Sequence, residues 1–264
     1  MRRPPILIGI AVLLCAGCSG ASGDDAAGPG SASVPPTDHG SAVRAAVAAT
    51  GRSTARIDER IEVRDGDTTY RISVTGRFDL AKDKGRLSVD FPGGAISHLD
   101  ETFAGDTVYL RGVQGSENTW GSIARDKAEA HSALRAPVND PEHVLRQVAA
   151  MRKASKVGKE EVNGAPAVHY RGMLDHATLT LRMAPKARAN AEKMRDLLDS
   201  DIPVFADAWV DEKGRLVRAR LSLTSMTSVT ATMTLSDLGK PVTANAPAPG
   251  DVMPLSSTAG VLPG

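Results

Sequence analysis

The sequence predicts an α+β domain in which one broad antiparallel sheet of about eleven strands is covered on its aliphatic face by about three helices. Apolar and polar residues alternate along many short segments, which is typical of strands with one buried face. Three segments instead repeat their apolar residues at helical spacing, and the second and third of them interrupt the run of strands. Gly, Asp and Asn separate most of these segments and indicate tight turns.

The chain begins with the three parts of a secretory signal: Arg2 and Arg3, an apolar run over residues 6–14, and small residues before Cys18. The apolar run is shorter than the roughly 20 residues that a membrane-spanning helix needs. Its end resembles a bacterial lipobox, in which a cysteine is acylated and becomes the new N-terminus. The sequence departs from that pattern at one place, because Cys15 stands where leucine is usual.

We therefore expect residues 1–17 to be a signal peptide and Cys18 to carry the acyl chains, palmitate among them. Cys18 would then anchor the protein to the extracytoplasmic face of the cell membrane. A secretory signal without a lipid is the alternative. Cys15 and Cys18 also have the spacing of a redox or metal pair, but they end an apolar leader, where no folded site can form.

Processing at Cys18 would leave a chain with no second cysteine and hence no intramolecular disulfide. Loss of Arg2 and Arg3 would leave 30 basic side chains against 31 acidic ones. This balance argues against a nucleic-acid partner and against a broadly basic membrane-binding surface. Aromatic residues make up only 3% of the chain, so the apolar surfaces must be mainly aliphatic.

Residues 18–40 contain mostly Gly, Ala, Ser, Pro and Asp, which predicts a flexible tether. An alanine-rich helix is expected over residues 41–50, with Gly51 as its stop. The clearest alternation lies in residues 69–80, where Tyr70, Val74 and Phe78 share one face. The strands predicted in this half cover residues 57–63, 69–80, 86–91, 95–103, 107–111 and 119–124.

A second helix begins after Asp140, with this residue as N-cap and Pro141 at the first helical position. A third helix is expected over residues 186–199, with Ala187, Ala191, Met194 and Leu198 along one side. The remaining predicted strands cover residues 156–162, 167–174, 178–183, 204–210, 216–223 and 229–235. We expect the domain to extend over residues 41–249 and residues 250–264 to form a flexible tail, mostly loop.

Several short motifs then resemble the LolA-like superfamily, and most of all the actinobacterial LppX/LprG type of lipoprotein. Besides the lipobox they are residues 107–111 leading to Trp120, Asp140-Pro141, residues 157–164 followed by His169-Tyr170, Trp209-Val210-Asp211 before Gly214-Arg215, and residues 239–242. The Ala-, Arg- and Gly-rich composition also indicates a GC-rich actinobacterium. The resemblance implies a strongly curved half-barrel sheet wrapped round the helices, with an apolar cavity that holds acyl chains or glycolipids.

The expected function is thus a membrane-anchored, extracytoplasmic lipoprotein that binds lipid or glycolipid for carriage or transfer in the cell envelope. It needs no cofactor or metal and is not an enzyme. The cavity candidates are Val74, Phe78, Val108, Leu110, Leu145, Val148, Met151, Val168, Tyr170, Leu179, Leu181, Met194 and Leu198. The same residues could instead pack into a solid core. The protein would then be an envelope sensor or scaffold that binds a transport or signalling protein and no lipid.

Catalytic patterns are missing from the sequence. No pair of its six histidines has the i, i+4 spacing of a zinc protease motif, and no Gly-x-Ser-x-Gly elbow occurs. We expect His169 and His176 to lie at solvated strand ends. Asp199 and Asp201 are more typical of a solvent-exposed helix end than of a catalytic acid pair. Trp120 and Trp209 fit packing in a strand better than stacking on a sugar or head group.

Overall fold

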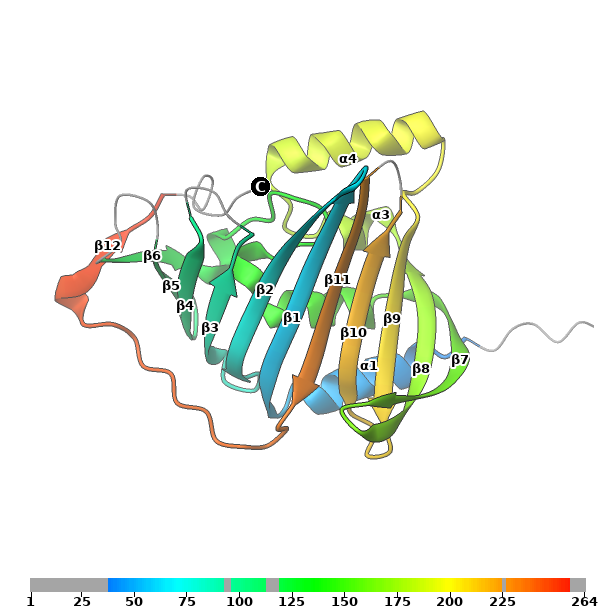
Figure 1. Cartoon of the computed structure of the whole chain (residues 1–264), viewed down its shortest axis with the longest axis horizontal. Coiled ribbons are helices and arrows are strands. Elements are labelled where there is room, and N and C mark those ends of the chain that lie inside the picture. Colours follow the sequence, from blue (N-terminus) through cyan, green and yellow to red (C-terminus); the bar gives the residue numbers. More distant parts are fainter. Residues whose placement is uncertain (1–37, 93–95, 113–118, 225–226, 257–264) are drawn as a thin grey trace, which may run out of the picture. The chain divides into compact units, whose positions relative to one another are not determined.

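The computed structural model describes residues 38–92, 96–112, 119–224 and 227–256. These described residues belong to one compact unit. Its twelve strands form one curved, open sheet in the order β12-β6-β5-β4-β3-β2-β1-β11-β10-β9-β8-β7 (Figure 1). All neighbours are antiparallel except β12 and β6. The α+β prediction with one broad antiparallel sheet is confirmed.

The first half of the sheet is a meander of hairpins. Its strands are β1 (Thr54–Asp65), β2 (Thr68–Asp79), β3 (Lys84–Asp90), β4 (His98–Ala104), β5 (Thr107–Arg111) and β6 (Trp120–Ala124). The alternation observed in the sequence reappears as alternating burial in β1. In β2, Val74 and Phe78 are fully buried, but Tyr70, predicted on the same face, is 50% exposed near the start of the strand. Gly66 closes the β1–β2 hairpin at a φ of 55°, a conformation that glycine adopts without strain.

The second half is a meander too, and its last strand returns to the first. Its strands are β7 (Arg152–Val162), β8 (Ala165–Leu174), β9 (Val204–Asp211), β10 (Leu216–Leu223) and β11 (Thr227–Ser236). Because β11 pairs with β1, the two halves form one continuous sheet, in which Ile61 lies opposite Ala231. The predicted C-terminal loop additionally contains β12 (Val252–Pro254), which runs parallel to β6.

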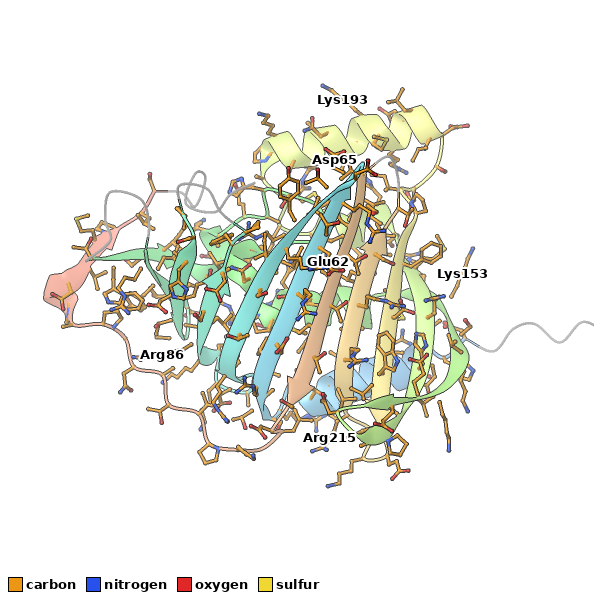
Figure 2. The ribbon with its side chains drawn as sticks, viewed as in Figure 1. Glu62, Asp65, Arg86, Lys153, Lys193 and Arg215 are labelled. Carbon is orange, nitrogen blue, oxygen red and sulfur yellow. The ribbon has the colours of Figure 1, made fainter. Side chains whose placement is uncertain are left out.

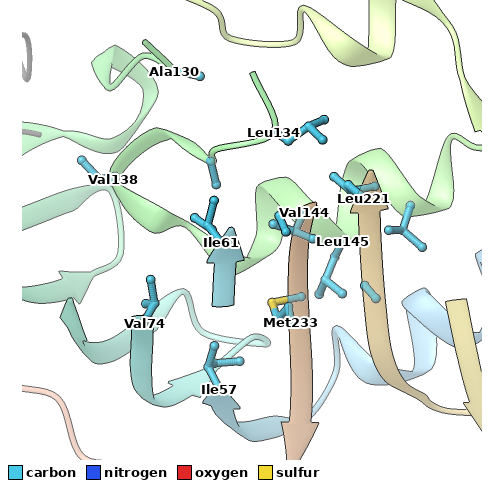
Figure 3. Close-up of a cluster of buried hydrophobic side chains, with 14 of the residues drawn as sticks. Ile57, Ile61, Val74, Ala130, Leu134, Val138, Val144, Leu145, Leu221 and Met233 are labelled. Carbon is cyan, nitrogen blue, oxygen red and sulfur yellow. The ribbon is translucent and has the colours of Figure 1, made fainter. Parts of the chain in front are cut away.

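Two helices cover the concave face of the sheet. Helix α1 (Gly40–Thr50) contacts β7, β9 and β10, and α2 (Pro141–Ala149) contacts β9 and β10. As predicted, Asp140 is the N-cap of α2, and its carboxylate accepts a hydrogen bond of 3.0 Å from the Glu142 amide. In Figure 3, Val144 and Leu145 of α2 pack toward the inner residues of β1, β10 and β11.

The strand predicted over residues 178–183 is wrong. Helix α3 (His176–Leu179) begins there, and Asp175 caps it by accepting a hydrogen bond from the Thr178 amide. Arg182 then has a φ of 55°, which is incompatible with a strand. The apolar residues of this segment alternate, but the cap and the reversal at Arg182 decide its structure. Helix α4 (Pro185–Leu198) follows, so the described part of the chain has four α-helices.

Residues 125–140 cross from β6 to α2 without a strand or an α-helix. Arg125 ties the two ends of this segment together, because its guanidinium donates two hydrogen bonds of 2.8 and 2.7 Å to the Asp140 carboxylate. Leu134, Val138 and Asn139 are buried with positive φ angles of 58°, 44° and 50°. Such angles are costly in residues other than glycine. The packing of the surrounding side chains therefore has to hold this segment in place.

Candidate functional site: an apolar cavity beneath α4

A cavity of about 450 Å³ lies between α4 and the end of the sheet where β10 finishes. Four parts of the chain contribute to it: the segment that leads into α2, the α3 region, α4, and the residues around β9 and β10. The lining residues are His131, Ser132, Ala133, Leu179, Met183, Ala187, Asn190, Ala191, Met194, Leu198, Ile202, Pro203, Leu223 and Thr224.

Helix α4 forms the outer wall. Pro185 occupies its first turn, and Asp199 ends it in the left-handed conformation. The apolar stripe predicted from the sequence, Ala187, Ala191 and Met194 with Leu198, faces the cavity. No residue of α4 is buried, and Leu197 is 81% exposed. The helix therefore lies over the sheet with an apolar stripe that the protein itself covers only in part.

The inner wall is fixed by the turn that follows α3. Two backbone hydrogen bonds join this turn to the segment that leads into α2. The Ala130 amide donates to the Arg182 carbonyl (2.8 Å), and the Ala184 amide donates to the Ala130 carbonyl (2.9 Å). Arg182 also donates hydrogen bonds to the carbonyls of Arg125 and Ala128. These bonds hold Leu179 and Met183 in the cavity wall, beneath α4.

The cavity can accept a hydrocarbon but offers little for chemistry. Its volume lies within the range of small-molecule sites, about 300–1,000 Å³. None of the described residues that line it is acidic, Lys or Arg. In the described parts of the chain, no group of three or more His, Cys, Asp or Glu side chains could hold a metal ion. No described helix is long and apolar enough to cross a membrane.

A buried polar cluster lies within the concave face, next to the segment that lines the cavity. Glu59 of β1 and Glu101 of β4 point inward, in phase with apolar neighbours along each strand. The Asn139 amide donates a hydrogen bond of 2.8 Å to Glu101, and Arg135 donates one of 3.4 Å to Asn139. Glu59 Oε1 and Glu101 Oε2 are buried without a hydrogen-bond partner.

Burial controls the ionisation of this cluster. Burial raises the pKa of Glu101 to about 8, although the Asn139 hydrogen bond and the charge of Arg135 favour its ionised form. Burial likewise raises the pKa of Glu59 to about 7 against the effect of Arg135. A neutral carboxylic acid can sit in an apolar interior at much lower cost than a carboxylate. The core thus holds two protonatable acids near neutral pH.

The expectation that His169 lies at a solvated strand end is wrong. His169 is buried on the outer face of the sheet, with Nδ1 at 2.8 Å from Glu160 and Nε2 at 2.6 Å from Asp207. Its ring stacks on Trp209 at 4.3 Å, and Asp207 also accepts from Arg171 and Arg220. The carboxylates come from β7 and β9, the strands on either side of β8, so they meet His169 only once the sheet register is set.

The tryptophans and the acid pair are placed as expected. Trp209 packs against Val162, Ala167 and Val217. Trp120 is half-buried, and the Arg111 guanidinium lies over its ring at 4.8 Å. Asp199 and Asp201 are exposed at the end of α4.

The structure brings three of the predicted cavity residues to the cavity: Leu179, Met194 and Leu198. Leu181, Val168 and Tyr170 are partly buried, and the Tyr170 ring lies 5.7 Å from that of His39. The others belong to the packed core and do not line this cavity: Val74, Phe78, Val108, Leu110, Leu145, Val148 and Met151. Cys18 lies outside the described residues.

Sequence reasoning missed the loop residues 131–133 and Ile202, which carry no periodic signal. Leu223 was missed as well, because it ends a predicted strand in phase with Ala219 and Leu221 but has no signal that places it beneath a helix. It also missed the polar cluster, although a signal was present. Glu59 is in phase with Ile57 and Ile61, and Glu101 is in phase with Leu99 and Phe103. A charged residue on the apolar face of a strand indicates a buried polar group.

Comparison with known proteins supports these observations at the level of the family. A protein of Streptomyces griseus, named an uncharacterized 31.2 kDa protein in the rplA-rplJ intergenic region, is 32% identical over 119 residues, which cover 43% of this chain and 38% of that protein. The match thus covers less than half of the length of that relative.

Similar solved structures include LprF from Mycobacterium bovis, with a TM-score of 0.49 and 15% identity over 81% of this chain and 99% of that one. The lipoprotein LppX of Mycobacterium tuberculosis has a TM-score of 0.44 and 15% identity over 78% and 97%. Residues 103–244, more than half of the chain, match the family model of the LppX_LprAFG lipoproteins. The chain therefore belongs to the LppX_LprAFG lipoprotein family.

Proposed function

We propose that this protein binds the acyl chains of a lipid or glycolipid in the cavity beneath α4, for carriage or transfer in the cell envelope. The observation that carries the proposal is the cavity itself, which is lined mainly by aliphatic side chains and walled by the stripe Ala187, Ala191, Met194 and Leu198. A ligand with a long hydrocarbon part fits such a lining better than a charged one.

The binding energy would come from removing hydrocarbon from water. Each buried methylene contributes about 0.8 kcal/mol, so a chain with several buried methylenes needs no charged contact. Two polar side chains of the lining, Asn190 and Thr224, are exposed to solvent. They could therefore contact a polar head group while the acyl chain lies deeper.

The proposal includes an anchor at Cys18, on the extracytoplasmic face of the membrane. Membership of a lipoprotein family supports it, together with the small residues Ala16 and Gly17 before Cys18. The residues between Cys18 and the first described residue, Asp38, would connect the anchor to the domain.

Native mass spectrometry of the protein purified from its own host's envelope tests the proposal. We expect a bound mass that organic solvent releases and that tandem fragmentation identifies as acyl chains. A chain that is purified without lipid, and that takes up none from a host lipid extract, would contradict it.

An envelope scaffold that binds a protein partner is the second candidate. The dense packing of the concave face around Phe78 and Phe103, whose rings lie 5.1 Å apart, favours it because much of the interior is filled. In the same mass spectra, a stoichiometric protein partner without lipid would support this candidate over the carrier.

A further inference from the structure

Large exposed apolar side chains gather at one end of the sheet. Eight described hydrophobic residues are exposed in this way, and six lie on α4 or on strand ends next to it: Tyr70, Met173, Met194, Leu197, Leu198 and Phe205. Met173 and Phe205 are paired across β8 and β9. Figure 1 shows these strand ends, and the start of β2, at the end of the sheet that carries α4.

This apolar rim meets the cavity at α4. Met194 and Leu198 belong both to the rim and to the cavity lining, so the exposed surface is continuous with the interior. The other two exposed hydrophobic residues, Val157 and Met253, lie on the edge strands β7 and β12. The concentration of exposed hydrophobic residues at this end of the sheet is therefore a local feature of the described part of the chain.

The charges of α4 are arranged around its apolar stripe. At 100° per residue, Lys186 lies on one flank of the stripe, and Arg188 and Arg195 lie on the other. Arg195 also forms an ion pair of 3.0 Å with the exposed Asp201. Lys193 and Glu192 lie further round the helix, one on each side, and Asp196 lies opposite the stripe. Lys193 is directed away from the sheet in Figure 2. Cations beside an apolar stripe are typical of helices that lie in the interface of an anionic bilayer.

We propose that this apolar rim, with α4 at its centre, docks on an anionic phospholipid bilayer, so that the cavity opens directly toward the membrane. The inference rests on the proposed lipid-binding function. Leu197 and Leu198 would enter the acyl boundary, while the flanking cations of α4 lie at the phosphate level. An acyl chain could then pass between bilayer and cavity without crossing water.

The near-neutral charge of the whole chain is compatible with this docking, because α4 itself carries four Lys and Arg side chains against two carboxylates. The reach of the chain is compatible as well. Asp38 lies twenty positions after Cys18, and at no more than about 3.5 Å per position this part of the chain can span at most about 70 Å. An anchor at Cys18 therefore leaves the rim free to reach the same membrane. A second copy or a protein partner would also cover apolar residues, but it would not require cations on both sides of the stripe.

The test uses the full-length protein, acylated in its host and reconstituted in vesicles with about one third phosphatidylglycerol. Single cysteines introduced by Leu197→Cys, Tyr70→Cys or Met253→Cys are labelled with the environment-sensitive fluorophore NBD. The unsubstituted protein measures any labelling of the native cysteines. Met253 is the matched control for Tyr70, because the two side chains are 51% and 50% exposed but only Tyr70 lies on the rim.

We expect the probes at positions 197 and 70 to shift to the blue and to be quenched by nitroxide-labelled lipids, and the probe at 253 to do neither. Three probes that remain equally exposed to water would overturn the proposal. So would a shift at 197 that nitroxide lipids do not quench, because this result indicates a protein contact. Uptake of a fluorescent fatty acid, measured on the same samples, separates the two proposals: uptake with an exposed rim contradicts only the docking, and a quenched rim without uptake contradicts only lipid binding.

Discussion

Filling the cavity beneath α4 should abolish the binding of acyl chains without unfolding the domain. Ala191 lines the cavity from the middle of the helix, so Ala191→Trp places an indole in the space that a ligand would occupy. Ala189 is exposed on the same helix and does not line the cavity, which makes Ala189→Trp the matched control. Either substitution costs less than about 0.7 kcal/mol of helix propensity.

The magnitude follows from the hydrocarbon displaced. If the indole excludes about four methylenes of the ligand, the binding free energy falls by about 3.2 kcal/mol, at about 0.8 kcal/mol for each. This loss corresponds to an increase of about 200-fold in the Kd. The assay is a titration with cis-parinaric acid, an unbranched fatty acid that fluoresces when it is bound. Circular dichroism on both variants establishes that the domain remains folded.

Equal affinities of the Ala191→Trp and Ala189→Trp variants would refute this reasoning. The ligand would then bind elsewhere, or not through its acyl chain. Loss of binding in both variants would indicate that α4 acts through its outer surface and not through its apolar stripe.

Three further predictions concern stability. Asp207→Ala should lower the free energy of unfolding by about 3 kcal/mol in urea titrations, because it leaves the buried His169 ring without one of its two carboxylates. The control is Asp100→Ala, which breaks the exposed ion pair with Arg111 and should lower the free energy of unfolding by less than about 1 kcal/mol. Burial raises the pKa of Glu101 from its ordinary value of 4.5 to about 8 in the folded protein, so it contributes stability that is complete below about pH 4.5 and is lost as the pH rises through 8. The fall in Tm between pH 6 and pH 9 should therefore be smaller in Glu101→Gln than in the unsubstituted protein. Gly76→Ala should cost more than about 2 kcal/mol, because its Cβ would clash with the backbone carbonyl of Arg86, whereas Gly158→Ala meets nothing within 4 Å and should be nearly neutral.

Each of these predictions has a clear contrary result. Equal losses for the two aspartate variants would mean that the His169 cluster is not held by Asp207. An unchanged pH dependence of the Tm in Glu101→Gln would show that Glu101 is ionised in the folded protein. Equal stability of the two glycine variants would mean that β2 and β3 can separate locally without cost.

The strands could be predicted because their pattern is local. Residues 69–80 alternate without a break, and β2 covers Thr68–Asp79. The helix boundary at Asp140-Pro141 could be predicted for the same reason, since an N-cap and a first-turn proline act within a few residues. The error at residues 178–183 shows the limit of alternation, because a cap at Asp175 outweighed it.

The environment of His169 could not be predicted in this way. Its partners Glu160 and Asp207 are 9 and 38 residues away in the sequence. They surround the ring only because β7 and β9 flank β8 in one particular register. The cavity residues near Ile202 and Leu223 depend in the same way on where α4 crosses the end of the sheet.

The position of the cavity follows from where the chain places its large side chains. Under α1 and α2 the concave face is filled by residues such as Phe78, Phe103 and Met233, which are fully buried. Under α4 the facing residues include Ala187 and Ala191, which are too small to fill the space above Leu223. A helix of 14 residues is marginal in water without tertiary packing. A bound acyl chain would supply the apolar contact that this helix lacks, so occupancy of the cavity and order in α4 should favour each other.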